Sequence, residues 1–159
     1  MLSKLQGMCH SAQYLMDPIP ESFRPLRDAV LAMPMARTLG LRYLRIAAGE
    51  ADLELAITDA LSFRPGQLQA TPVFALGDFA AVSAAASLLP PGWSNATIDG
   101  AVKLFAPAGG VLLRAHGRVV DAGRLLSVCR ADIYAVDAAG TATLCATWLG
   151  TARNVPPRS

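Results

Sequence analysis

A single carboxylate interrupts the most apolar stretch of this sequence. Residues 70–91 read ATPVFALGDFAAVSAAASLLPP, and Asp78 is the one charged residue among them. Thr71 as a cap and Pro72 in the first turn predict the start of a helix, and the Pro-Pro pair predicts its stop. Because nearly every other residue is apolar, this helix is expected to be buried almost all round. Such a setting raises the pKa of a carboxyl group towards the range useful for general-base catalysis.

Two roles for Asp78 are open on the residues alone. A carboxylate inside an apolar helix costs free energy unless it is paired, hydrogen-bonded or protonated. In the first role, Asp78 is a catalytic group kept in an apolar site. In the second, it is a structural group, held by backbone N–H groups or by a neighbouring hydroxyl such as that of Thr97.

Composition limits the class of protein. The chain has 159 residues, which suits one domain with a sizeable core. Hydrophobic residues make up 53% and charged residues only 16%, so part of the apolar excess is expected to be buried between the subunits of an oligomer. The net charge of +2 is too small to indicate nucleic acid binding. Asp78 at the centre of a membrane span would cost roughly 3 kcal/mol, so no membrane partner is expected.

The sequence lacks the common signatures of other chemistries. It has no P-loop, no dinucleotide-binding glycine pattern and no serine-centred nucleophile elbow. Residues 1–19 contain no sustained apolar run, so a signal peptide is not expected. The cysteines are odd in number and widely spaced, which favours free thiols in the cytoplasm over a disulfide framework or a metal site. Neither a metal nor a cofactor is therefore expected. The cysteines are Cys9, Cys129 and Cys145.

Hydropathy patterns predict an α+β domain. Helical spacing begins at Ser22-Phe23-Arg24-Pro25 and is expected to end at Pro34. Period-two alternation predicts two strands before the buried helix and four after it. His116 stands between two arginines on what is predicted to be a solvated strand face. The expected strands lie within residues 41–59, 96–105, 111–120, 125–136 and 141–150.

One long apolar helix needs a sheet curled around it, and the edges of such a sheet invite pairing with a second copy. We therefore expect one domain over residues 20–152. A loose extension, residues 1–19, precedes it, and a flexible tail, residues 153–159, follows it.

Four segments, in order, resemble parts of one known family. MPMARTLGLRYLRIAAGEADLEL is similar to its opening turn and first strand, and ALGDFA is similar to its helix motif. TIDGAVKLFAPA and DAGRLLSVCRADIY are similar to two later strands with their turns. Over residues 33–152 the chain thus resembles hotdog-fold acyl-CoA thioesterases of the phenylacetate-degradation, or PaaI-like, type. The resemblance implies a curved antiparallel sheet wrapped around one long central helix, here with an extra N-terminal helix.

The resemblance also implies catalytic residues. Asp78 matches the carboxylate that serves as general base or nucleophile in active relatives. Thr97 falls where many relatives place a hydroxyl that helps to position the attacking water. The helix start would supply a backbone N–H that polarises the thioester carbonyl, from the second protomer of a dimer.

The substrate-binding positions depart from the family pattern. Gln69-Ala70-Thr71 falls where the family has His-Gly-Gly; a backbone donor at Ala70 persists, but the methyl group restricts how closely a thioester approaches. Phe63 stands in place of an asparagine that often contacts the carbonyl. Arg124 lies at a hairpin where basic residues of relatives contact the phosphates of the carrier, although an ordinary surface charge is the alternative.

The implied function is hydrolysis of an acyl-CoA, or a related acyl thioester, to free acid and thiol in a groove at the dimer interface. Coenzyme A enters as part of the substrate. The alternative is a non-catalytic hotdog module that binds acyl thioesters or assembles with partners, because the usual His-Gly-Gly is replaced. A dehydratase would need a histidine beside the carboxylate, and neither His10 nor His116 is near the helix in sequence.

Overall fold

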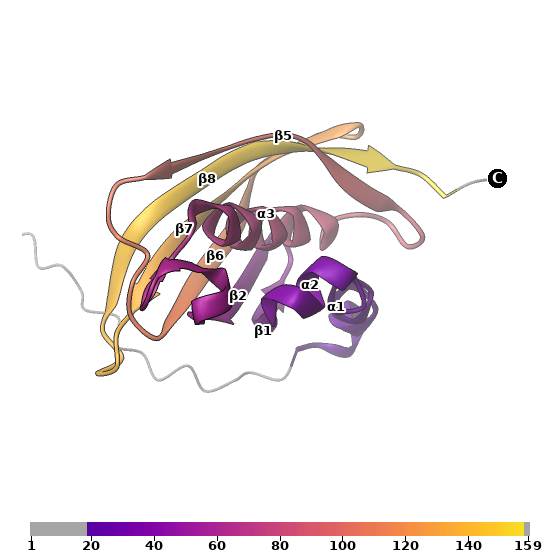
Figure 1. Cartoon of the computed structure of the whole chain (residues 1–159). Helices are drawn as coiled ribbons and strands as arrows, with labels where there is room; N and C mark the ends of the chain where they lie inside the picture. The colour runs from indigo at the N-terminus through magenta and orange to yellow at the C-terminus, as the bar shows by residue number, and fades with distance from the viewer. Residues whose placement is uncertain (1–18, 158–159) are drawn as a thin grey trace, which may run out of the picture.

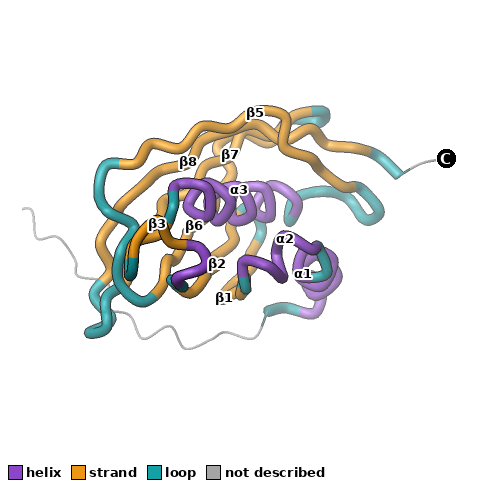
Figure 2. Tube along the Cα trace, in the orientation of Figure 1, coloured by secondary structure: helices purple, strands orange, loops and turns teal. Residues whose placement is uncertain are grey.

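A curved antiparallel sheet wraps around the long helix α3 (Ala70–Ala86), as Figures 1 and 2 show. The computed structural model of the chain describes residues 19–157. Six strands pair in the order β1-β2-β6-β7-β8-β5, and each pairing is antiparallel. The predicted α+β architecture is therefore confirmed. The strands are β1 (Arg42–Ala47), β2 (Glu50–Ala56), β5 (Ser94–Leu104), β6 (Leu112–Ala122), β7 (Leu126–Val136) and β8 (Ala142–Val155).

Two short helices precede the sheet. A 3₁₀ turn, Glu21–Phe23, leads into α1 (Arg24–Leu31), close to the predicted start. α1 ends before Pro34 as expected, but this proline also begins a second helix, α2 (Pro34–Leu39), which the sequence reading did not predict. At the first helical position the missing N–H of proline costs nothing. Gly40, at φ +64°, then ends α2 in the left-handed conformation.

A small hairpin leads into α3. It pairs β3 (Ser62–Arg64) with β4 (Gln67–Leu68), outside the main sheet, and was not predicted. The Gln69 N–H donates to the Leu61 carbonyl, which keeps the chain extended up to residue 69. Gln69 is therefore the N-cap of α3. The prediction of Thr71 as the cap is wrong, because Thr71 already lies in the first helical turn.

The ends of the domain differ from the expected boundaries. β8 continues to Val155, so the boundary expected after residue 152 falls inside this strand. The expected extension, residues 1–19, lies outside the described residues except for Ile19. Within residues 19–157, no helix combines the length and the apolar character that crossing a membrane would require.

Two glycines let α3 lie directly against the sheet. A Cβ atom on Gly117 of β6 would lie 2.2 Å from the Ala80 carbonyl oxygen, and one on Gly77 would lie 2.7 Å from Cβ of Trp148. Both distances are far shorter than the roughly 3.5–4.0 Å of a favourable carbon contact. Any side chain at either glycine would therefore push the helix away. The other fully buried residues of α3 include Val73, Leu76, Ala80, Ala81 and Ala84.

The outer face of the sheet carries a network of charged side chains. On β2, Leu53 points into the core, and the alternating residues Asp52 and Glu54 point to the opposite face. These two carboxylates are nevertheless only 3% and 4% exposed. Guanidinium groups cover them: Arg45 donates to Asp52 at 3.0 Å, and Arg114 donates to Glu54 at 3.1 Å.

His116 lies on this polar face, as predicted, but its side chain is only partly exposed because it belongs to the network. Its Nδ1 atom is hydrogen-bonded to the Asp52 carboxylate, and its side chain is 35% exposed. The hydrogen bond with Asp52 raises the pKa of His116, although burial opposes the shift. Burial would raise the pKa of Asp52, but the hydrogen bonds from His116 and Arg45 outweigh it and hold this pKa below its usual value.

We expect this pair to make stability depend on pH. A histidine whose pKa is raised by folding contributes stability that is complete below its unfolded pKa of about 6.5 and is lost as pH rises through the folded value. His116→Gln should therefore lower the melting temperature most near pH 6 and least near pH 9, as measured by scanning fluorimetry. Arg37→Gln, an exposed change on α2, is the control and should show no such trend. A difference for His116→Gln that is constant with pH would contradict the pairing.

Candidate active site

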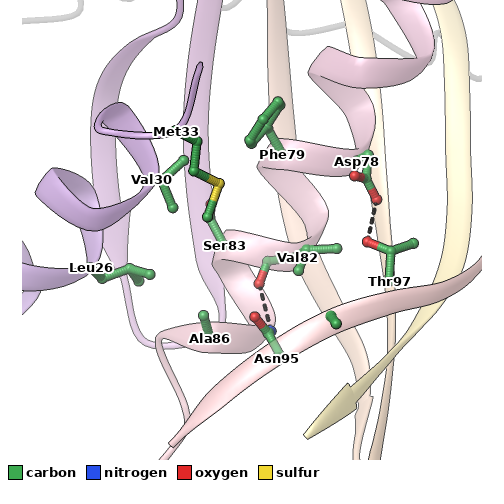
Figure 3. A pocket seen from close by; sticks show the side chains of 11 residues that line it. Leu26, Val30, Met33, Asp78, Phe79, Val82, Ser83, Ala86, Asn95 and Thr97 are labelled. Carbon is green, nitrogen blue, oxygen red and sulfur yellow. Dashed lines mark hydrogen bonds between the residues drawn. The ribbon is translucent and has the colours of Figure 1, made fainter. Parts of the chain in front are cut away.

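The Asp78 carboxylate and the Thr97 hydroxyl meet between α3 and β5. Asp78 lies in the middle of α3, and Thr97 Oγ1 donates a hydrogen bond of 2.8 Å to Asp78 Oδ1 (Figure 3). The pairing of β5 with β8 shifts register between Thr97 and Asp99. Such bulges re-aim side chains, and this one lies at the residue that contacts the carboxylate.

Burial raises the pKa of Asp78, and the hydrogen bond from Thr97 partly offsets this effect. The carboxylate is therefore a stronger base than an exposed aspartate. Burial, followed by the negative charge of Asp78, raises the pKa of Cys129 to about 12. Cys129 thus stays a thiol at neutral pH and does not act as a nucleophile beside Asp78.

An apolar cavity opens beside Asp78. It has a volume of about 150 Å³ and lies between α1, α3 and the start of β5; we call it the α1–α3 cavity. Asp78 and Thr97 stand at one end of it, and Ala86 stands at the other, two turns further along α3 (Figure 3). Leu26 and Val30 of α1 form the wall opposite α3.

The predicted carbonyl-binding residues lie at the start of α3. Phe63, Gln69 and Ala70 line a second cavity, of about 460 Å³. Thr71 is exposed and does not line this cavity. Within residues 19–157 no side chain caps α3, so the N–H groups of its first turn have no side-chain acceptor there.

The start of α3 is too far from Asp78 to serve the same reacting group within one chain. Asp78 lies eight positions after Ala70, which corresponds to roughly 12 Å along the helix axis. A donor that stabilises an oxyanion must lie about 3 Å from the oxygen. A site that uses both groups therefore needs a second copy of the chain.

Arg124 lies in a third cavity, apart from the other predicted site residues. It lines a cavity of about 350 Å³ near the C-terminal end of α3, together with Leu88, Trp93 and Asn154. The predicted site residues are thus distributed over both ends and the middle of α3. Within one chain the structure joins the two predicted catalytic residues and separates them from the predicted substrate-binding residues.

The wall of the α1–α3 cavity is the part of the site that sequence reasoning missed. Leu26 and Val30 follow helical spacing, so the signal of an apolar helix face was present in the sequence. Nothing in the spacing indicates which element this face meets. Among residues 19–157, no three histidine, cysteine, aspartate or glutamate side chains gather where they could hold a metal ion.

Solved structures similar to this chain include several proteins of the thioesterase superfamily. A thioesterase family protein from Silicibacter pomeroyi is 29% identical, with a TM-score of 0.81 over 85% of this chain and 98% of that chain. The PaaI protein of E. coli, from the phenylacetic acid degradation operon, is 17% identical, with a TM-score of 0.71 over 86% and 94% of the two chains. A thioesterase from Haemophilus influenzae is 15% identical, with a TM-score of 0.73 over 84% and 90%.

Comparisons of the sequence alone, with protein-family models and with curated proteins, find no match. The relationship therefore rests on the arrangement of the elements around α3 and on their order along the chain. The chain has the hotdog fold of the thioesterase superfamily, and its resemblance to PaaI-like thioesterases is confirmed at this level.

Proposed function

We propose that the protein hydrolyses an acyl-CoA, or a related acyl thioester, with Asp78 as the catalytic carboxylate. The observation that carries the proposal is a half-buried carboxylate of raised pKa, fixed by Thr97, at the end of an apolar cavity. The likeness to the thioesterase family protein of S. pomeroyi supports the reaction class.

In this reaction Asp78 removes a proton from a water molecule. The water oxygen attacks the carbonyl carbon of the thioester, and the carbonyl oxygen becomes an oxyanion. Collapse of this intermediate breaks the carbon–sulfur bond, and the departing thiolate takes the proton back from Asp78. Thr97 holds Oδ1, which leaves Oδ2 to accept the proton. In the variant route, Asp78 attacks the carbonyl carbon itself, and the carbon–sulfur bond breaks to release the thiolate. Water then hydrolyses the resulting anhydride to the free acid and the Asp78 carboxylate, and the thiolate takes up a proton that this step releases.

The oxyanion would be stabilised by the start of α3 from a second protomer. The N–H groups of a first helical turn point outward and carry partial positive charge. The separation of Ala70 from Asp78 along one helix is the reason that the donor must come from another copy. β5 is an edge strand of the sheet, which makes it a candidate for pairing between protomers. Its apolar residues Ile98 and Leu104 are 57% and 47% exposed.

A non-catalytic binding module is the second candidate, and a specific observation favours it. Ala70 carries a methyl group at the start of α3, where the resemblance implies glycine. Ala70 lines the cavity at this helix start, so the methyl group stands where a thioester would approach. In either candidate, Arg124 would contact the phosphates of the carrier.

Assembly is the first test. We expect the purified protein to be a homodimer, or a dimer of dimers, in light scattering at micromolar concentration. Ile98→Asp places a charge on the exposed side of β5 and should give monomers without hydrolytic activity. Val120→Asp is the matched control, because Val120 is 58% exposed on β6, away from the proposed interface. A stable, active monomer of the unaltered chain would contradict the shared site.

The helix start supplies the second test. Ala70→Gly removes the methyl group and should raise kcat/KM for thioester hydrolysis, because the carbonyl can then approach the N–H donors more closely. Steady-state assay of thiol release measures the effect. A well-folded Ala70→Gly variant with lower activity would show that the protein uses a different carbonyl contact.

Asp78 supplies the third test. Asp78→Asn keeps the size of the side chain but removes the base, so hydrolysis should fall by about 10²–10⁴-fold. The melting temperature should hold or rise, because a neutral amide is easier to bury than a carboxylate. Both quantities are measured on the same preparation. An Asn variant that melts much lower yet keeps wild-type turnover per folded molecule would identify Asp78 as a structural residue.

Thr97→Val is the companion variant. The hydrogen bond from Thr97 lowers the pKa of Asp78, so its removal should raise this pKa further. The acidic limb of the pH profile of kcat/KM should then move to higher pH, a shift that a purely structural role of Thr97 would not cause.

A further inference from the structure

We infer that the α1–α3 cavity is the acyl subsite of the proposed hydrolase and that it takes a compact, uncharged, apolar acyl group whose length is limited by Ala86 and Leu26. This inference rests on the proposed function, because it takes Asp78 as the position of the reacting carbonyl.

The α1–α3 cavity runs away from Asp78 along α3. Asp78, Phe79, Val82 and Ala86 lie on one face of α3, at spacings that bring side chains into line along a helix. The carboxylate stands at one end of this face, and the face runs on for two turns, roughly 12 Å, to Ala86. A group attached to a carbonyl at Asp78 therefore has an apolar path along α3, with α1 as its opposite wall (Figure 3).

Charge is the second argument. Among the described residues that line the cavity, Asp78 is the one charged group. Two polar side chains further along are already engaged: the Ser83 hydroxyl is hydrogen-bonded to that of Tyr43 at 2.6 Å, and the Asn95 amide donates to the Val82 carbonyl at 3.0 Å. If the acyl group carried a carboxylate of its own, that carboxylate would be buried without a cationic partner and close to the negative charge of Asp78. For the same reason, the highly charged coenzyme A part of the substrate does not occupy this cavity.

Size is the third argument. An apolar cavity of about 150 Å³ holds a molecule of about the size of benzene. An acyl group of about six carbons should therefore fill the subsite. Each methylene buried up to that length should increase affinity roughly fourfold, and methylenes beyond it should add nothing.

Ala86 and Leu26 define the limit. Ala86 lies at the last position of α3 and is partly buried, so a larger side chain there enters the cavity without disturbing the packing of α3 against the sheet. Leu26 projects from α1 towards the same end (Figure 3). Ala86→Leu should shorten the preferred acyl group, and Leu26→Ala should lengthen it.

The test uses alkyl-CoA thioethers, which carry the acyl-sized chain but cannot be hydrolysed. Titration calorimetry with S-butyl, S-hexyl, S-octyl and S-dodecyl coenzyme A should show affinity that rises to hexyl and then levels or falls. Ala86→Leu should weaken hexyl binding by at least tenfold while butyl binding stays within about twofold. Leu26→Ala should move the optimum to octyl. Ala138→Leu, an equal change in the exposed β7–β8 turn, is the control and should bind the series as the unaltered protein does.

The outcomes separate this inference from the proposed function. Affinity that keeps rising to dodecyl, or a length profile that neither cavity variant changes, overturns the acyl subsite even if thioesters are hydrolysed. The expected thioether profile without any thiol release from the matching acyl-CoA thioesters supports the subsite and overturns the hydrolase. Because Ala86→Leu and Leu26→Ala change the cavity in opposite directions, the failure of one to fold leaves the other as a decisive test.

Discussion

The contact between the backbone of α3 and the sheet determines the geometry of everything else in this protein. At Gly117 the strand approaches the Ala80 carbonyl with no side chain between them, and at Gly77 the helix approaches Trp148. These contacts leave α3 little freedom to rotate about its axis. Successive helical residues are separated by roughly 100°, so the residue after Gly77 points away from the contact with Trp148. That residue is Asp78, and its carboxylate is thereby directed towards β5 and Thr97.

Opposing forces on one carboxylate give the site its chemical character. Burial disfavours the charged form of Asp78, whereas the Thr97 hydroxyl favours it. Full burial without a partner would leave the group protonated and inert as a base. Full exposure would leave it a weak base in water. Thr97, at the bulge in β5, donates one hydrogen bond to Oδ1 of Asp78 and leaves Oδ2 for other contacts. This arrangement suits a carboxylate that must both stay ionised and accept a proton.

The sequence was sufficient for the central helix and the six strands of the main sheet, but not for α2, the β3–β4 hairpin or the long-range contacts. Period-two runs and the apolar stretch around Asp78 predicted the strands and the central helix, because these signals are local. Thr97 was named as a possible partner of Asp78, and the two side chains do meet. The bond between Asp52 and His116 joins residues 64 positions apart, and no periodicity reports such a pairing. The wall that α1 contributes to the cavity was missed for the same reason.

The buried thiols have a consequence for how opening of this fold can be followed. Cys129 and Cys145 are fully enclosed, and burial raises the pKa of both thiols. The thiolate is the form that attacks a thiol-modifying reagent, so neither buried sulfur reacts while the fold encloses it. Cys129 on β7 lies close enough to Asp78 on α3 for the charge of Asp78 to raise its pKa further. Alkylation of Cys129 would therefore report the separation of α3 from β7. The rate at which Cys129 is alkylated would thus measure local unfolding next to Asp78, the candidate catalytic residue.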